Sequence, residues 1–204
     1  MAVLTPSAFS RRQLLALAGA AALAACDSKP GGHTFHGVDI TGADYAQALS
    51  LTDPDGKVRT LADWKGKLVV VFFGYTQCPD VCPTTMAELA QVRQALGPDG
   101  DKLQGVFVTV DPERDSAALL KDYVNNFGAG FVGLRGTPEQ TLATAKAFKV
   151  FFSKVPGKTD TSYTMDHTAG SYVFDTQGRI RLFERHGTGV KFLTEDFKAL
   201  LAGA

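Results

Sequence analysis

The stretch that decides the fold reads Leu68-Val69-Val70-Val71-Phe72-Phe73-Gly74-Tyr75-Thr76-Gln77-Cys78-Pro79-Asp80-Val81-Cys82-Pro83. Its first part is a near-continuous apolar run, which is typical of a strand covered on both faces. Residues 83–96 then show a helical pattern, with a proline at the first position, apolar residues at helical spacing and Gly97-Pro98 as a stop. Two cysteines separate the predicted strand from the predicted helix. A thiol pair at such a junction indicates thiol or metal chemistry.

The elements on either side of this stretch are predicted from turn signals and apolar periodicity. A strong turn at residues 53–56 predicts an N-terminal β-hairpin. We expect strands at residues 105–110 and 131–134, helices at 115–126 and 137–148, a second hairpin from 171–175 and 179–184, and a last helix capped by Thr194. This order predicts an α/β protein with a central mixed β-sheet flanked by helices. With the thiol pair at the first strand–helix junction, it resembles the thioredoxin fold.

The first 25 residues have the pattern of a lipoprotein signal peptide. Arg11 and Arg12 precede an apolar stretch from residue 14 to 25, which is shorter than the ~20 residues of a spanning helix. Leu23-Ala24-Ala25-Cys26 resembles a bacterial lipobox, so Cys26 is the predicted lipidation site, and Ser10-Arg11-Arg12-Gln13-Leu14-Leu15 resembles a twin-arginine export signal. The alternative is an uncleaved membrane anchor. Both place the rest of the chain outside the cytoplasm, and we expect the periplasmic side of a bacterial envelope.

The composition of the remaining chain predicts a tether followed by one domain, and it argues against nucleic acid as a partner. Residues 26–42 hold Ser, Lys, Pro and Gly with few apolar residues and are predicted to be a flexible tether, so that residues 43–204 form one domain. Removing residues 1–25 takes away two arginines and no acidic residue, which changes the net charge from zero to −2. With no strongly basic stretch, nucleic acid is not an expected partner. In an oxidising compartment the two remaining cysteines form a disulfide unless they are kept reduced or metal-bound.

The two prolines that follow the cysteines predict where the thiols lie. A residue before proline avoids the helical region, so both Cys78 and Cys82 are expected on a loop, with Cys82 acting like an N-cap. Helix N-termini favour a thiolate. Three residues separate the cysteines, whereas the redox proteins of this fold usually have two. This spacing allows a disulfide, but it favours a metal.

Two thiolates are not a full site for a tetrahedral metal, and histidine is the best candidate for a further ligand. Cu(I) is satisfied by two or three soft ligands, and an added imidazole also suits Cu(II). His167 lies in a predicted polar loop that should face the thiol pair, with Asp166 placed to orient it. His186 should lie at the opposite end of the next strand and remain at the surface. His33 and His36, on the tether, are either solvated or a second metal pair.

Three motifs in order resemble one known family: residues 74–83, residues 110–115 (Val110-Asp111-Pro112-Glu113-Arg114-Asp115) and Asp166-His167. Together they are similar to the Sco/SenC family of membrane-tethered, thioredoxin-like copper proteins, over roughly residues 45–203. The resemblance implies that Cys78, Cys82 and His167 are copper ligands. It also implies a role in assembling the dinuclear copper centre of cytochrome c oxidase. From the residues alone, the second motif is a turn before a helix in which Asp111 can bond backbone N–H groups.

The expected function is therefore a lipid-anchored copper metallochaperone that binds one copper ion, as Cu(I) or Cu(II). It would deliver this copper to the copper-bearing subunit of the oxidase. The alternative is a thiol–disulfide oxidoreductase in which Cys78 and Cys82 form a redox-active pair that reduces the oxidase cysteines. Other copper chaperones and thioredoxin-like reductants are further candidate partners. A sensor would need a partner that the sequence does not reveal, and a peroxidase is less favoured because no arginine is evidently paired with Cys78.

Overall fold

The apolar run forms the central strand β4 (Leu68–Gly74), and all seven of its residues are buried. It pairs in parallel with β5 (Leu103–Thr109) and antiparallel with β9 (Gly170–Phe174). Neighbours on both edges and helices on both faces explain why nearly every side chain in this strand is apolar. The predicted buried strand is therefore confirmed.

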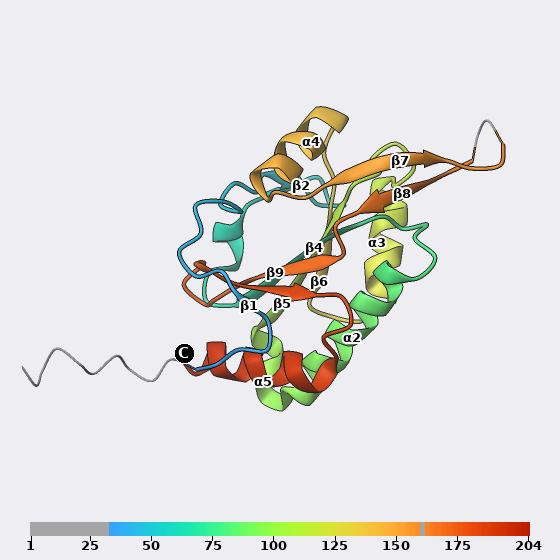
Figure 1. Ribbon diagram of the computed structural model, residues 1–204. Helices are drawn as coiled ribbons and strands as arrows, with labels where there is room; N and C mark the ends of the chain where they lie inside the picture. The colour runs from blue at the N-terminus through green and yellow to red at the C-terminus, as the bar shows by residue number, and fades with distance from the viewer. Residues whose placement is uncertain (1–32, 160–161) are drawn as a thin grey trace, which may run out of the picture. The chain divides into compact units, whose positions relative to one another are not determined.

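The structure is a computed structural model that describes residues 33–159 and 162–204. Within this part of the chain, six strands form a mixed sheet in the order β1-β10-β9-β4-β5-β6. This sheet lies at the centre of the view in Figure 1. The other strands of this sheet are β1 (Val38–Asp39), β6 (Phe131–Leu134) and β10 (Ile180–Arg185). Two small hairpins are formed by β2 (Leu51–Thr52) with β3 (Val58–Arg59), and by β7 (Phe152–Pro156) with β8 (Tyr163–His167). The helices are η1 (Leu61–Trp64), α2 (Val81–Ala95), η2 (Gly97–Lys102), α3 (Ala117–Asn125), α4 (Pro138–Ala147) and α5 (Val190–Leu201).

Helices cover both faces of the central sheet (Figure 1). Leu68 and Val70 share one core cluster with residues of α2 and α5, among them Leu89 and Phe197. Phe73 points to the opposite face, because alternate strand residues do, and its ring lies 5.1 Å from Phe148 at the end of α4. The α/β architecture and the N-terminal hairpin are thus as predicted.

Two helix starts differ from prediction. The last helix begins at Val190, after Gly189 as N-cap, and the Thr194 hydroxyl donates to the Val190 carbonyl at 2.6 Å within the helix. Thr194 is therefore not a cap. Helix α2 begins at Val81 with Asp80 as N-cap, two residues before the proline that was expected to open it. Pro83 is tolerated there because amides in the first turn have no partner within the helix.

The folded unit begins earlier than the predicted tether allows. Contacts divide the chain into Met1–Thr34 and Phe35–Ala204, and only residues 33 and 34 of the first unit are described. Val38 and Asp39 pair with β10, and the amides of His36 and Gly37 donate to the Asp196 carboxylate. Residues 35–42 thus belong to the folded unit. The predicted signal peptide, Cys26 and the start of the tether lie outside the described residues.

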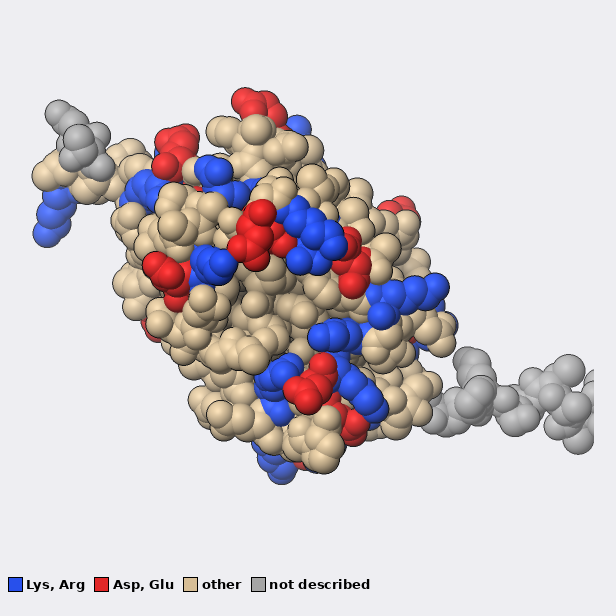
Figure 2. Space-filling view, turned by 180° about the vertical axis from the view of Figure 1, so that it is seen from behind, with Lys and Arg blue, Asp and Glu red and all other residues tan. Residues whose placement is uncertain are grey.

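The described part of the chain contains no helix that combines the length and the apolar character needed to cross a bilayer. On the face that Figure 2 shows, basic and acidic side chains are interspersed and do not gather into a patch of one sign. This pattern agrees with the formal net charge of zero for the whole chain.

Candidate metal centre

Cys78 lies on the loop between β4 and α2, as predicted. The loop curls back so that the Cys78 amide donates to the Tyr75 carbonyl at 3.2 Å. The Cys82 amide in turn points at the Cys78 sulfur, with N and Sγ 3.4 Å apart. Cys78 is half-buried, and both thiols are free. The loop therefore brings the two sulfurs to the same side of the junction without a disulfide.

Cys82 differs from its prediction in two ways. It lies inside the first turn of α2, because Asp80 is the N-cap, and its side chain is fully buried. Burial raises the pKa of the Cys82 thiol, and the nearby Cys78 thiol acts in the same direction. The expected thiolate stabilisation at the helix N-terminus is therefore outweighed by desolvation in the metal-free protein. A bound cation would reverse this balance, because a coordinating thiol is deprotonated.

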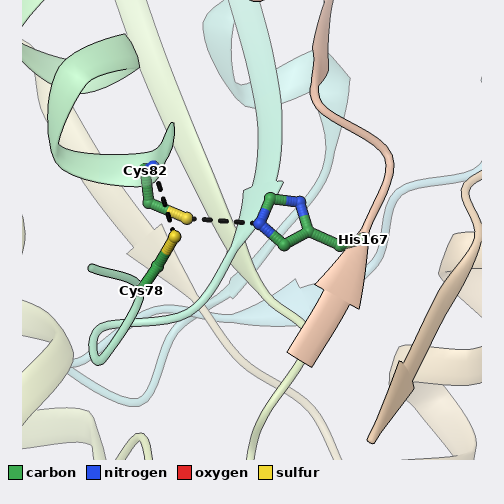
Figure 3. A group of neighbouring side chains, drawn as sticks. All are labelled: Cys78, Cys82 and His167. Atoms are coloured by element: carbon green, nitrogen blue, oxygen red, sulfur yellow. Dashed lines mark hydrogen bonds between the residues drawn. The ribbon is translucent and has the colours of Figure 1, made fainter. Parts of the chain in front are cut away.

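His167 is the last residue of strand β8 and does not lie on a polar loop. It pairs with Phe152 of β7, so the hairpin β7–β8 sets its position. Figure 3 shows the imidazole pointing at the two cysteines, with Nε2 3.4 Å from the Cys82 sulfur. The rings of Phe72 and Tyr75 meet it edge-on at 5.9 and 6.0 Å. The expected approach of His167 to the thiol pair is thus observed, although the element that carries it was missed.

A backbone contact selects the tautomer of His167. Its Nδ1 lies 3.1 Å from the Thr168 carbonyl oxygen, which can only accept a hydrogen bond. The proton of the neutral ring is therefore on Nδ1, and Nε2 presents its lone pair to the sulfurs. Burial lowers the pKa of His167, which keeps the ring neutral near neutral pH. Asp166 was expected to orient the imidazole, but it is exposed and the Thr168 carbonyl holds the ring nitrogen.

The three ligand atoms form a group that one metal ion can fill. The Cys78 and Cys82 sulfurs and a ring nitrogen of His167 all lie within 4.8 Å of one another. Metal–ligand bonds of about 2.0–2.3 Å place atoms that share an ion at most about 4.6 Å apart, so a movement of a few tenths of an ångström at most brings all three atoms within reach of one ion. A groove of about 310 Å³, lined among others by Tyr75, Cys78 and His167, opens onto the group. An ion or an exchanging ligand can therefore reach the site from solvent.

The other histidines do not join this group. The strands β9 and β10 are antiparallel, so His186 returns to the edge of the sheet that carries the site, and its amide donates to the Ala169 carbonyl. The expectation that His186 lies at the opposite end is therefore wrong. Its Nδ1 lies 3.1 Å from the Thr85 hydroxyl. His36 contacts Glu195 at 2.8 Å, and neither His33 nor His36 belongs to a metal-ligating group of the described residues.

A buried carboxylate that holds the thiol loop was not predicted. Asp115 is fully buried and accepts hydrogen bonds from the Thr76 amide, the Thr76 hydroxyl and the Thr109 hydroxyl. Desolvation raises its pKa, and the three hydrogen bonds act against that shift. Asp111, expected to bond backbone amides, instead accepts from Arg114 and from the Tyr163 hydroxyl. The sequence motif at residues 110–115 marked this segment, but the hydrogen-bond partners of Asp111 and Asp115 are visible only in the fold.

Comparison with known proteins identifies relatives over most of the chain. The SCO1/SenC family profile matches residues 38–202. A SCO2-like protein of Rickettsia felis is 35% identical over 132 residues, which cover 64% of each chain, so this chain spans less than two thirds of that relative. Copper-bound ScoI of Bradyrhizobium japonicum is 39% identical with a TM-score of 0.68, covering 81% of this chain and 99% of that one. Apo Sco1 of Thermus thermophilus is 34% identical with a TM-score of 0.74, covering 84% and 99%. The fold is thioredoxin-like, as predicted.

Proposed function

The chain belongs to the SCO1/SenC family, and from that premise we propose that it is a membrane-tethered copper metallochaperone. It binds one copper ion through Cys78, Cys82 and His167 and delivers it to the copper centre of cytochrome c oxidase. The observation that carries this proposal is the group of two thiols and one imidazole within 4.8 Å. Thiolate sulfur selects soft Cu(I), and imidazole nitrogen also suits Cu(II). The copper-bound ScoI of Bradyrhizobium japonicum, a relative 39% identical, supports the choice of metal.

Exposure of the site supports a cargo role for the metal. Cys78 and His167 are half-buried and line an open groove, whereas Cys82 is buried behind them. An acceptor protein can therefore replace the outer ligands one at a time while Cys82 still holds the ion. Transfer by such ligand exchange needs no oxidation or reduction of the copper.

The site of action is proposed from the N-terminal sequence. Lipidation of Cys26 would tether the folded unit to the periplasmic side of a bacterial membrane after export by the twin-arginine route. The recipient would then be the copper-bearing subunit of the oxidase. Metabolic labelling with a fatty acid, lost in Cys26→Ser, tests the anchor.

Titration of copper into the full chain tests the metal site directly. The chain is purified in detergent with its thiols reduced, and Cu(I) and Cu(II) are added separately. We expect one copper per chain, and a loss of tight binding in Cys78→Ala, Cys82→Ala and His167→Ala. His186→Ala is the matched control, because His186 lies at the same edge of the sheet but outside the ligand group. An unchanged Cu(II) absorption spectrum in His167→Ala would contradict the three-ligand site.

The same titration separates the metallochaperone from its competitor. A thiol–disulfide oxidoreductase would use the same pair, with the half-exposed Cys78 as the attacking thiol. Binding well below one copper per chain, together with rapid reduction of a disulfide in the oxidase subunit, would favour that function. Movement of copper from the loaded chain to the metal-free oxidase subunit, followed by the subunit's absorption, would favour the metallochaperone.

A further inference from the structure

The hairpin that carries His167 stands apart from the central sheet. Strands β7 and β8 form a two-stranded sheet of their own, and Figure 1 shows them extending away from the other strands. Met165 is the one buried residue of the two strands, and the others are exposed or half-buried. An isolated two-stranded hairpin is marginally stable in water. Side-chain contacts must therefore hold His167 at the thiol loop.

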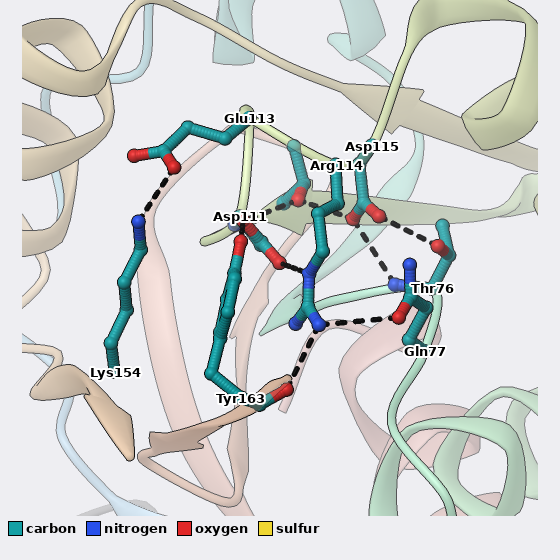
Figure 4. Close-up of polar contacts among 9 residues, drawn as sticks. Thr76, Gln77, Asp111, Glu113, Arg114, Asp115, Lys154 and Tyr163 are labelled. Carbon is teal, nitrogen blue, oxygen red and sulfur yellow. Dashed lines mark hydrogen bonds and ion pairs between the residues drawn. The ribbon is translucent and has the colours of Figure 1, made fainter. Parts of the chain in front are cut away.

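Arg114 makes such contacts with both ligand-bearing segments, as Figure 4 shows. Its Nη1 donates to the backbone carbonyl of Tyr163, the first residue of β8, at 2.9 Å. The same nitrogen donates to the side-chain oxygen of Gln77, next to Cys78, at 3.2 Å. The guanidinium also lies over the Tyr163 ring, 3.6 Å from its centroid. One side chain thus joins the strand of His167 to the loop of Cys78.

Asp111 fixes Arg114 in this position. The Asp111 side chain is almost fully buried, and it accepts from Nε of Arg114 and from the Tyr163 hydroxyl, the latter at 2.9 Å. Tyr163 is therefore held through its ring, its hydroxyl and its carbonyl. A second link between this turn and the hairpin is the Glu113–Lys154 ion pair at 2.6 Å, but both side chains are about half exposed. Exposed pairs are screened and contribute little.

We propose that Arg114 is a positioning residue for the metal centre: it keeps the hairpin β7–β8 against the thiol loop so that Nε2 of His167 reaches the ion held by Cys78 and Cys82. The inference rests on the proposed metal site. Arginine suits this role because its planar fork bonds several acceptors while it stacks on an aromatic ring. Lysine keeps the charge but can neither stack in the same way nor offer the fork.

The chain offers a matched control for the loss of an arginine. Arg93 is as buried as Arg114, with side-chain exposures of 20% and 21%. It donates to the carbonyls of Gly100 and Leu103 and to Asp101, all in the region of η2 and the start of β5. Arg93→Ala therefore removes a similar set of hydrogen bonds without touching the thiol loop or the hairpin.

The test compares Arg114→Ala, Arg114→Lys and Arg93→Ala in the full chain, with copper as the probe. Residues that orient metal ligands typically change metal affinity about 10–100-fold, and we expect a loss of this size in Arg114→Ala. We expect a partial loss in Arg114→Lys and none in Arg93→Ala. In the Cu(II) spectrum of Arg114→Ala, the features of the imidazole ligand should weaken. In the metal-free protein, amide hydrogen exchange of β8 should be faster, while β4 and β5 exchange as in the parent.

Specific outcomes would overturn the inference. It fails if Arg114→Ala binds copper as tightly as the parent, or if Arg93→Ala loses affinity to the same extent. If Arg114→Ala does not fold, Tyr163→Phe replaces it, because this change removes only the hydroxyl that reaches Asp111; parent-like affinity and β8 exchange there would also overturn the inference. If the parent itself binds no copper, the proposed function fails, whereas β8 exchange in the metal-free variants still decides whether Arg114 holds the hairpin.

Discussion

Gly74, the last residue of β4, leaves room for the Cys82 thiol. A Cβ at this position would lie 2.7 Å from the Cys82 sulfur and 3.0 Å from the rings of Phe107 and Phe72. The rings are packed in the core and cannot yield easily, so the sulfur would have to move. We therefore predict that Gly74→Ala displaces Cys82 and weakens copper binding, measured by competition with a chelator.

Loss of stability alone could also follow from this substitution, and Gly133→Ala distinguishes the two effects. Gly133 lies on β6, away from the candidate ligands, and a Cβ there would lie 2.3 Å from the Leu120 side chain. Both variants should unfold at lower denaturant concentrations than the parent, since overpacking costs about 1–3 kcal/mol. Only Gly74→Ala should lose copper affinity. Equal affinities in the two variants would show that Gly74 does not shape the site.

At the scale of elements, the carboxyl groups of Glu184 on β10 and Asp196 on α5 lie close together, next to the segment before β1. Glu184 of β10 is buried, and neither of its oxygens has a hydrogen-bond donor among the described residues. Burial and the neighbouring Asp196 raise the pKa of Glu184 from 4.5 to about 7. Asp196 meanwhile accepts the amides of His36 and Gly37. The protonated Glu184 is thus the form that fits this junction.

This pair predicts how stability depends on pH. Because the pKa of Glu184 is higher in the folded than in the unfolded chain, its stabilising contribution is complete below about pH 4.5 and is lost as the pH rises through about 7. The loss is at most about 3 kcal/mol. Glu184→Gln should therefore be more stable than the parent at about pH 8 and similar at about pH 4.5, measured by urea unfolding.

The control for this prediction is Glu195→Gln, on α5 next to Asp196. Glu195 is about half exposed and contacts His36, so its substitution should leave the pH dependence close to that of the parent. If Glu184→Gln instead loses stability in parallel with the parent as the pH rises, Glu184 is ionised in the folded protein at neutral pH and the pair does not act as described.

At the scale of the whole molecule, metal binding is coupled to folding and to protons. The ligands come from the β4–α2 junction and from a separate hairpin, so the unfolded chain cannot present them together. With free copper at about 100 times its Kd, the free energy of unfolding should rise by about 2.7 kcal/mol in the parent and much less in His167→Ala. Thermal unfolding with and without Cu(I) measures this difference.

Copper affinity should also fall as the pH falls. Copper displaces a proton from each thiol, and the raised pKa of Cys82 makes its proton harder to displace. The lowered pKa of His167 keeps the imidazole neutral until the pH is below its usual 6.5, so histidine adds little to this dependence near neutral pH. An affinity independent of pH between about 6 and 8 would mean that the thiols are already ionised in the metal-free protein.

Local sequence signals predicted most of the elements and pointed to the three candidate ligands. Apolar periodicity and caps predicted β4, β5, α2, α4 and the hairpin β9–β10, because these patterns depend on neighbours a few residues apart. The same local signals wrongly predicted Thr194 as the cap of the last helix, which begins after Gly189. They also predicted a flexible tether up to residue 42, because residues 35–42 have few apolar side chains, although Val38 and Asp39 pair with β10. The three candidate ligands were predicted from their spacing and their motifs, and the structure brings them together.

Tertiary structure alone decided how those ligands are held. It buried Cys82, and this burial raises the pKa of the Cys82 thiol. It also placed His167 on a strand, where the ring Nδ1 lies against the Thr168 carbonyl and not against Asp166. It also brought His186 back to the edge of the sheet that carries the site and joined the two ligand-bearing segments through Arg114. The burial of Cys82 and the contacts of Arg114 depend on residues far apart in the chain, whereas the tautomer of His167 is set by the neighbouring Thr168 carbonyl once the fold has placed the ring. Residue types and spacing therefore specify which metal chemistry is available, and the packed fold specifies its geometry.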